Sequence, residues 1–353
     1  MRHLNAHRAL LTILAVLLAS SSPTFAADVV RVRTKDGQES FRGEIKRITP
    51  QEIIIDVKGV AEDLSVGNVT SVRFDDEPDE LGDARLRIGS GDFLEAIDLI
   101  KKIDLAKLGN AQPAVTQDIQ FYYAYCMAQR ALAGAESLKD AGGLMVKFVG
   151  DNKDSYHFFE ANEIIGDLLV AMGRADQAER FYGTAEQAPW PEAALRIGLA
   201  RARIKQSQGD HAAAIPEFEK VLSSGLQSDL ADRMRLAAKL GKAASMAESQ
   251  QGEAGVQLVY DVIKAAEKGD TEIHARAYNA LGDCHRTMGQ DKAAAIAYLH
   301  VDAMYYQHPP LHAESLARLA AVWDKLEMPN RAATARKKLN SMYPNSKWAK
   351  QSS

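Results

Sequence analysis

The stretches NEIIGDLLVAMGRADQAERFYGTAEQAP (residues 162–189) and YNALGDCHRTMGQDKAAAIAYLHV (residues 278–301) repeat one pattern. In each, an apolar residue and a glycine are followed by a second glycine, an alanine and a tyrosine at matching intervals. Small residues of this kind are needed where two helices cross closely. The pattern therefore predicts two antiparallel helices that turn at the second glycine. The matching positions are Ile165-Gly166, Gly173, Ala178 and Tyr182 in one copy, and Leu281-Gly282, Gly289, Ala294 and Tyr298 in the other.

Both stretches resemble the tetratricopeptide repeat, a helical hairpin of about 34 residues. The resemblance implies a mainly α fold, a right-handed α-solenoid over residues 84–350 that binds other proteins. Weaker copies of the pattern are Gly91, Ala96 and Ile100; Gly209, Ala214 and Phe218; and Ala320, Ala333 and Tyr343-Pro344.

The alanines expected at the helix crossings give the number of hairpins. They are separated by 82, 36, 80 and 39 residues, and are Ala96, Ala178, Ala214, Ala294 and Ala333. Each long interval holds two periods of about 40 residues, so two further crossings are expected near residues 137 and 254, the second at Ala254. The sequence thus predicts about seven hairpins, with no interval long enough for an inserted catalytic domain.

Residues 28–76 change to an alternation of apolar and polar residues with period two, which is typical of half-buried strands. Turn residues at Asp36-Gly37, Thr49-Pro50 and Lys58-Gly59 divide the segment into four or five short strands. The order resembles that of SH3-like or Sm-like small β-barrels, with a bend or bulge expected at Gly43. We expect the acidic residues 77–83 to form a solvated linker to the helices.

Charge argues against nucleic acid as a partner of this unit. Residues 28–77 contain eight basic and eleven acidic residues, a net charge of −3. Binding of phosphates normally needs a basic surface. We therefore expect a unit that docks onto protein or stabilises the array.

The N-terminus predicts export. Residues 1–8 are positively charged, residues 9–19 are apolar, and small residues follow as far as Ala26, as in a signal peptide cleaved after residue 26. An N-terminal membrane anchor is the alternative, but the apolar run is about half of the roughly 20 residues that a membrane span needs. We expect a periplasmic protein that does not insert into the membrane after this segment is removed.

Catalytic and cofactor-binding motifs are missing from the sequence. It contains no phosphate-binding loop, dinucleotide fingerprint or nucleophile elbow, so we expect no cofactor and no enzyme activity. His308 and His312 have a spacing typical of metal ligands on a helix, but Pro309 and Pro310 should break that helix and leave both histidines in a loop. Cys126 and Cys284 are too few for a disulfide framework and are expected to be buried.

The resemblance also implies a groove, because the first helices of successive repeats line the concave side of such arrays. Acidic residues are followed along this surface by basic ones, which would orient a bound protein or peptide. The same charges are equally consistent with ordinary solvated helix surfaces. The candidate groove residues are Glu160, Glu163, Asp167, Arg196, Arg203, Arg276, Asn279, Asp283 and Arg286.

The ending Tyr343-Pro344-Asn345-Ser346 resembles a junction in bacterial periplasmic tetratricopeptide proteins. The resemblance implies a non-catalytic scaffold in cell-envelope assembly or division. The alternative is a structural component that docks through its β unit onto a membrane complex or onto itself. The sequence identifies neither the partner nor the oligomeric state.

Overall fold

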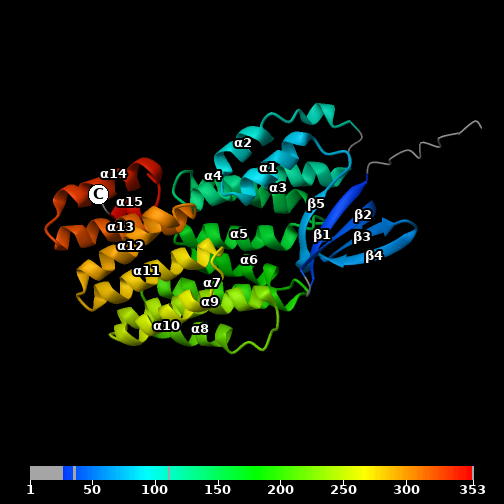
Figure 1. Ribbon diagram of the computed structural model, residues 1–353. Helices are drawn as coiled ribbons and strands as arrows, with labels where there is room; N and C mark the ends of the chain where they lie inside the picture. Colours follow the sequence, from blue (N-terminus) through cyan, green and yellow to red (C-terminus); the bar gives the residue numbers. More distant parts are fainter. Residues whose placement is uncertain (1–26, 35–36, 110–111, 352–353) are drawn as a thin grey trace, which may run out of the picture.

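The computed structural model describes residues 27–34, 37–109 and 112–351 of the 353-residue chain. A small antiparallel sheet precedes a long array of helices (Figure 1). The signal peptide expected at residues 1–26 lies outside the described residues. The strands are β1 (Asp28–Thr34), β2 (Gly37–Ile48), β3 (Glu52–Val57), β4 (Val60–Ser65) and β5 (Val69–Arg73).

Gly43 forms the corner of the sheet. It pairs with Asp28 of β1, whereas the next residue of β2, Glu44, pairs with Asp56 of β3. A Cβ atom on Gly43 would lie 1.9 Å from the Asp56 carbonyl oxygen, so only glycine fits there. A register shift between Ile45 and Arg47 follows at once, which confirms the expected bend or bulge.

The sheet shares its core with the helices. Its strand order is β4-β3-β2-β1-β5, so β4 and β5 are the edges of a bent sheet. Val30 and Val72 of its buried face pack in one apolar cluster with Leu81, Ile97 and Val115 from the first helices. In a small barrel the sheet would curl around its own buried face. Here the first helices cover that face instead.

The expected solvated linker over residues 77–83 is not one. The first helix, α1, begins at Asp79, and Leu81 within it is fully buried. The side chain of Glu77 is only 3% exposed, and its carboxylate accepts a hydrogen bond from the Phe74 amide. Arg85 donates to both oxygens of the same carboxylate at 2.8 Å. Acidic composition was misleading here, because Arg85 pairs with the carboxylate inside the fold.

The helices described in the structure pair into seven hairpins, which confirms the number expected. Two short 3₁₀ segments, Val66–Asn68 and Leu105–Lys107, and a last helix, α15 (Lys347–Gln351), complete the chain. The hairpins are α1 (Asp79–Gly89) with α2 (Phe93–Ile100), α3 (Pro113–Leu132) with α4 (Leu138–Asp151), α5 (Phe158–Ala171) with α6 (Ala175–Ala185), α7 (Pro191–Ser207) with α8 (His211–Leu222), α9 (Asp229–Glu248) with α10 (Gly252–Ala265), α11 (Thr271–Thr287) with α12 (Asp291–Met304), and α13 (Pro309–Lys325) with α14 (Pro329–Met342).

Pairs of small buried residues recur where the two helices of a hairpin approach. A Cβ atom on Gly255 would lie 3.0 Å from the Ala243 carbonyl oxygen, and one on Gly166 would lie 2.4 Å from the ring of Tyr182. In six hairpins the two members of the pair are twelve residues apart: Ala84 and Ala96, Gly166 and Ala178, Ala202 and Ala214, Ala243 and Gly255, Gly282 and Ala294, and Ala320 and Ala332.

Three of the expected crossing positions need correction. Ala254 and Ala333 are exposed, and their neighbours Gly255 and Ala332 are buried instead. The crossing expected near residue 137 lies at Ala141, because the turn between α3 and α4 has five residues where the other six hairpins have three. Counting alanines located each hairpin, but it could not fix which neighbouring residue faces the partner helix.

The three-residue turns share one backbone conformation. Their middle residue has positive φ, as in Gly173 (φ 76°), and the next amide, from Arg174, donates to the carbonyl of Leu169 at 2.8 Å. This is the Schellman arrangement, which satisfies the last carbonyls of the first helix. Gln250 and Glu327 hold the same position with φ of 62° and 55°, so the fold imposes this conformation even on residues with a side chain.

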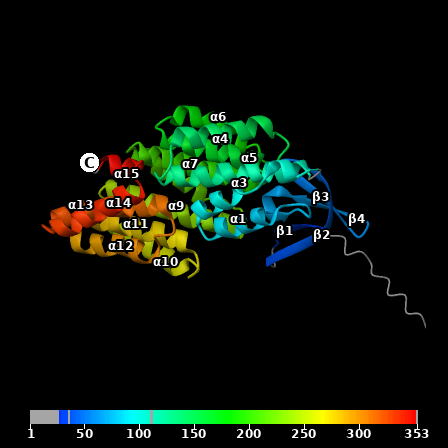
Figure 2. The ribbon, with the colours of Figure 1, turned by 90° about the horizontal axis from the view of Figure 1, so that it is seen from above.

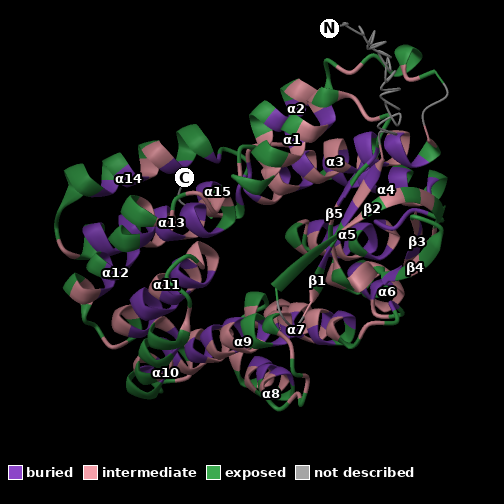
Figure 3. Cartoon of the chain, turned by 45° about the vertical axis from the view of Figure 1, so that its right-hand side comes forward, coloured by how far each residue is buried: buried purple, intermediate pink, exposed green. Residues whose placement is uncertain are grey.

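The array curves until its end meets an early hairpin. The Asn345 amide donates to the Gly134 carbonyl at 2.7 Å, and Ala133 packs in one apolar cluster with Leu316 and Tyr343. A Cβ atom on Gly134 would lie 2.2 Å from the Ser346 nitrogen, so this contact also depends on a glycine. Figure 3 shows the helices arranged as a ring, and Figure 2 shows the sheet at one end of it.

The hairpin turns give a stability test. Gly173→Ala forces a Cβ atom into the left-handed region and should lower the free energy of unfolding by about 1 kcal/mol. Gly183→Ala, inside α6 with open space around it, is the matched control and should raise stability by about 0.5 kcal/mol. Denaturant unfolding followed by circular dichroism measures both; equal stabilisation by the two changes would contradict the role given to the turn.

Candidate protein-binding groove

The first helices of the hairpins form the inner surface of the array. Successive first helices contact one another, α7 with α9, α9 with α11 and α11 with α13, while each second helix packs on the outside of its own hairpin. All nine predicted groove residues lie on α5, α7 or α11. Their contacts divide them into side chains that hold the fold together and side chains that remain available.

The acidic residues lie together on α5. The Glu160 side chain is exposed, the Glu163 carboxylate lies 3.1 Å from Nε of Arg196 on α7, and Asp167 accepts a 2.7 Å hydrogen bond from the Tyr182 hydroxyl. Burial, with Asp167 and Glu160 nearby, raises the pKa of Glu163 to about 7 against the opposing effect of Arg196. The α5 surface therefore gathers three carboxylates, of which Glu163 pairs with Arg196 and Glu160 lies 3.6 Å from Nδ1 of His157.

Arg203 is the exceptional cation of the inner surface. Among the described residues no hydrogen bond or ion pair is made by its guanidinium, although Arg276 pairs with Glu272 at 2.8 Å close by. Burial and the neighbouring charge of Arg276 lower the pKa of Arg203 to about 9. Arg276 in turn lowers the pKa of Glu272 to about 2. One partly buried positive charge between α7 and α11 thus lacks a direct partner, although Glu272, Asp167 and Glu163 lie near enough to favour it.

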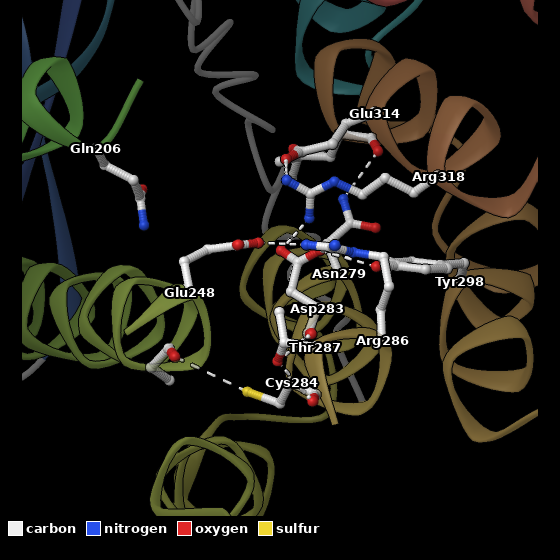
Figure 4. Close-up of polar contacts among 12 residues, drawn as sticks. Gln206, Glu248, Asn279, Asp283, Cys284, Arg286, Thr287, Tyr298, Glu314 and Arg318 are labelled. Carbon is white, nitrogen blue, oxygen red and sulfur yellow. Dashed lines mark hydrogen bonds and ion pairs between the residues drawn. The ribbon is translucent and has the colours of Figure 1, made fainter. Parts of the chain in front are cut away.

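Figure 4 shows that the α11 residues mostly serve the fold. Asp283 is 4% exposed; it accepts a 2.8 Å hydrogen bond from the Tyr298 hydroxyl and pairs with Arg318 of α13. Asn279 is also buried and donates to the Leu311 carbonyl at 2.9 Å. Arg286 pairs with Glu248 of α9. These side chains join neighbouring hairpins, so Asn279 and Asp283 are not presented to a partner.

A signal for this role was present in the sequence. Asp167 and Asp283 each follow the glycine of the repeat, and each bonds to a tyrosine fifteen residues later. The repeated Gly-Asp followed by Tyr at a fixed interval marks a carboxylate used inside its own hairpin.

A buried ionic cluster around Asp118 on α3 was not foreseen. Its carboxylate accepts hydrogen bonds from Arg85 and from the Tyr156 hydroxyl at 3.0 Å, and lies 3.2 Å from Nε2 of His157. Burial disfavours the charged forms of Asp118 and His157. The contact between these two side chains outweighs burial, so the pKa of Asp118 is lowered and that of His157 is raised. The cluster joins α1, α3 and the start of α5. Its members are far apart in the sequence, so spacing gives no hint of it.

A large cavity opens where the sheet meets these hairpins. Its volume is about 1580 Å³. Tyr122, His157, Glu160 and Arg196 line it from the helical side, and residues of β1, β2 and β5 line it from the other. Two predicted groove residues, Glu160 and Arg196, therefore lie in the wall of this cavity.

His308 lies outside the helices, as expected, at the N-cap of α13, but His312 is not placed as expected. The two prolines form the first turn of α13, where their missing amide donors cost nothing. His312 is consequently helical and fully buried, with Nδ1 2.8 Å from the Tyr343 hydroxyl and Nε2 2.7 Å from Asp302. Cys126 and Cys284 are buried free thiols, as expected, and burial raises the pKa of both to about 12.

Comparison with known proteins matches one hairpin of the helical array to a known family. Residues 275–308 match the tetratricopeptide repeat family. The helical part of this chain has a tetratricopeptide-repeat-like fold. It is similar in fold to the Rap conjugation gene regulator of the plasmid pLS20, solved in complex with the Phr* peptide, with a TM-score of 0.55 and 13% identity over 74% of each chain.

A tetratricopeptide repeat protein from Parabacteroides merdae ATCC 43184 is also similar, with a TM-score of 0.49 and 16% identity over 78% of this chain and 96% of that one. No protein of curated function matches the sequence. Within the described part of the chain, no helix is long and apolar enough to span a membrane. The tetratricopeptide repeat fold is a scaffold for protein interaction.

The raised pKa of Glu163 predicts a pH dependence of stability. Between its unfolded value near 4.5 and its folded value near 7, the folded protein holds a proton that the unfolded chain releases. Stability is therefore lost as the pH rises through this window. Wild type should lose up to about 3 kcal/mol relative to Glu163→Gln between pH 4 and 8. Denaturant unfolding at each pH measures this. If the free energies of unfolding of the two proteins change in parallel with pH over this range, the raised pKa of Glu163 is contradicted.

Proposed function

We propose that this protein is an exported, non-catalytic scaffold that holds a segment of another protein against its inner surface, in cell-envelope assembly or division. The observation that carries the proposal is Arg203. A partly buried guanidinium with no carboxylate partner is costly, because burial removes water without supplying hydrogen-bond acceptors. A partner carboxylate placed beside Arg203 and Arg276 would remove that cost.

The charges around Arg203 also give the partner a direction. Glu160 and Glu163 lie on α5, whereas Arg203 and Arg276 lie on the following inner helices α7 and α11. A segment can bind with its acidic residue beside the arginines and a basic residue beside α5, so that opposite charges meet at both places. The same segment bound in the reverse direction would place like charges together. Electrostatics of this kind select orientation and partner more than they add affinity.

The similar fold of the Rap regulator supports a peptide as the bound form. That protein was solved in complex with the Phr* peptide. In the present array the Asp283 network holds neighbouring hairpins in place, while the Arg203 guanidinium makes no hydrogen bond or ion pair among the described residues.

Site-specific photocrosslinking in the native cell tests the groove. A photoreactive residue at Glu160, on the inner surface, should capture a protein partner, and one at Tyr260, exposed on the second helix α10, should not. The double change Arg203→Glu and Arg276→Glu should reduce capture about tenfold or more, because two charge-assisted contacts become repulsive.

The matched control reverses two charges on outer helices, Arg180→Glu on α6 and Lys264→Glu on α10, both exposed. Capture should survive this control. Equal capture at positions 160 and 260, or capture unaffected by the inner double change, would refute binding in the groove.

Export is tested separately. Residues 1–26 fused to a reporter enzyme that folds only outside the cytoplasm should give activity, and Leu14→Arg, which interrupts the apolar run, should abolish it. The intact mass of the native protein should correspond to a chain that begins at Ala27. Recovery of the full-length mass from the cytoplasm would refute export.

A further inference from the structure

One face of the β-sheet gathers four arginines. Side chains alternate along a strand, so Val30 and Val32 enter the core while Arg31 and Arg33 of β1 point to the opposite face. Val29, on that same face, pairs with Arg42 of β2 and with Arg73 of β5. We call Arg31, Arg33, Arg42 and Arg73 the arginine face.

The arginine face is almost uncompensated. Within the described residues, no hydrogen bond or ion pair involves the guanidinium groups of Arg31, Arg33 and Arg42. Arg73 lies 3.9 Å from Glu77, whose carboxylate already receives two 2.8 Å hydrogen bonds from Arg85. A concentrated positive surface therefore exists on a chain whose net charge is −4.

This face is exposed and forms a wall of the 1580 Å³ cavity, which is open to solvent. Ser40 and Ser71, the partners of Arg31 on the two neighbouring strands, also line the cavity and supply short hydroxyl side chains between the longer ones. Aromatic residues, including Tyr122 and Trp190, also line the cavity. Guanidinium groups, hydroxyl groups and aromatic rings thus face one space that is open to solvent.

We propose that the arginine face binds an acidic polypeptide segment in extended conformation. Guanidinium groups form bidentate pairs with carboxylates, the strongest of the common charged hydrogen bonds. Arg31 and Arg33 are two residues apart on a strand, so their side chains start about 7 Å apart, which is also the spacing of alternate side chains on an extended peptide. A segment with acidic residues at every second position matches this register.

The cavity favours a peptide over a nucleic acid. Asp75, Asp79, Asp83 and Glu160 also line it. A nucleic acid carries a charge at every phosphate and would bring several of them close to these carboxylates. A peptide presents carboxylates only where guanidinium groups receive them. The proposal rests on the proposed function, since it names an acidic segment of the bound protein as the part recognised by the sheet.

The test uses a labelled peptide of alternating Glu and Ser, twelve residues long, with binding to the whole protein measured by fluorescence anisotropy. Arg31→Glu with Arg33→Glu should weaken binding about tenfold or more, because two charge-assisted pairs are lost and replaced by repulsion. Arg31→Gln with Arg33→Gln, which removes charge without reversing it, should weaken binding in the same direction. Circular dichroism checks that each variant is folded.

The matched control is Lys46→Glu with Arg47→Glu. Both residues are exposed on β2 but lie outside the cavity lining, and this change alters the net charge as much. Affinity should stay within about twofold of wild type, since charges beyond a Debye length are largely screened. Equal loss in control and test variants, or no loss in either, would overturn the proposal.

Two further measurements separate the alternatives. In the first, twelve-nucleotide single-stranded RNA competes with the labelled peptide. If RNA displaces the peptide at a lower concentration than unlabelled peptide does, the ligand of the arginine face is a nucleic acid and the proposal is overturned. Arg203→Glu with Arg276→Glu reports on the groove, because these residues lie outside the cavity lining, and it should weaken peptide binding less than Arg31→Glu with Arg33→Glu does. Loss only in that variant would place the acidic segment in the groove and overturn the role of the sheet, while the proposed function would stand.

Discussion

The close approach of two helices at a pair of small residues determines the geometry of the whole array. Where Gly166 meets the ring of Tyr182, or Gly255 meets the backbone at Ala243, one additional methyl group would force the helices apart. A separation of twelve residues between the paired positions fixes both the length of the turn and the residues that face outward. Six of the seven hairpins therefore share one spacing between their two helices, and the array results from repetition of this contact.

This regularity is why much of the fold could be predicted from sequence. Small residues at fixed intervals gave the number of hairpins, and alternation with turn residues gave the strands, including the bend at Gly43. The errors arose where one residue decides the outcome. Ala254 and Gly255 are both small, and only the helix phase distinguishes the exposed residue from the buried one. Likewise, Pro309 and Pro310 can end a helix or begin one, and here they begin α13.

Charged residues were harder to interpret for a physical reason. The sequence supplies charges but not their partners, so Asp283, which binds Tyr298 and Arg318, looked the same as a residue open to a ligand. Net charge was equally misleading for the sheet, because eleven acidic residues spread over several surfaces concealed four arginines on one face. Long-range clusters such as Asp118 with Arg85 and His157 have no local signature at all.

The contact between Asn345 and Gly134 has a mechanical consequence. An open solenoid behaves as a spring, because small changes in the angle between neighbouring hairpins add up to a large displacement of its free end. Here the last hairpin rests on the second one, so the array resembles a hoop. A hoop resists stretching, and a change in one interhelical angle must be balanced by opposite changes elsewhere around it. Distant hairpins are thereby coupled through curvature alone, without any chain of specific side-chain contacts between them.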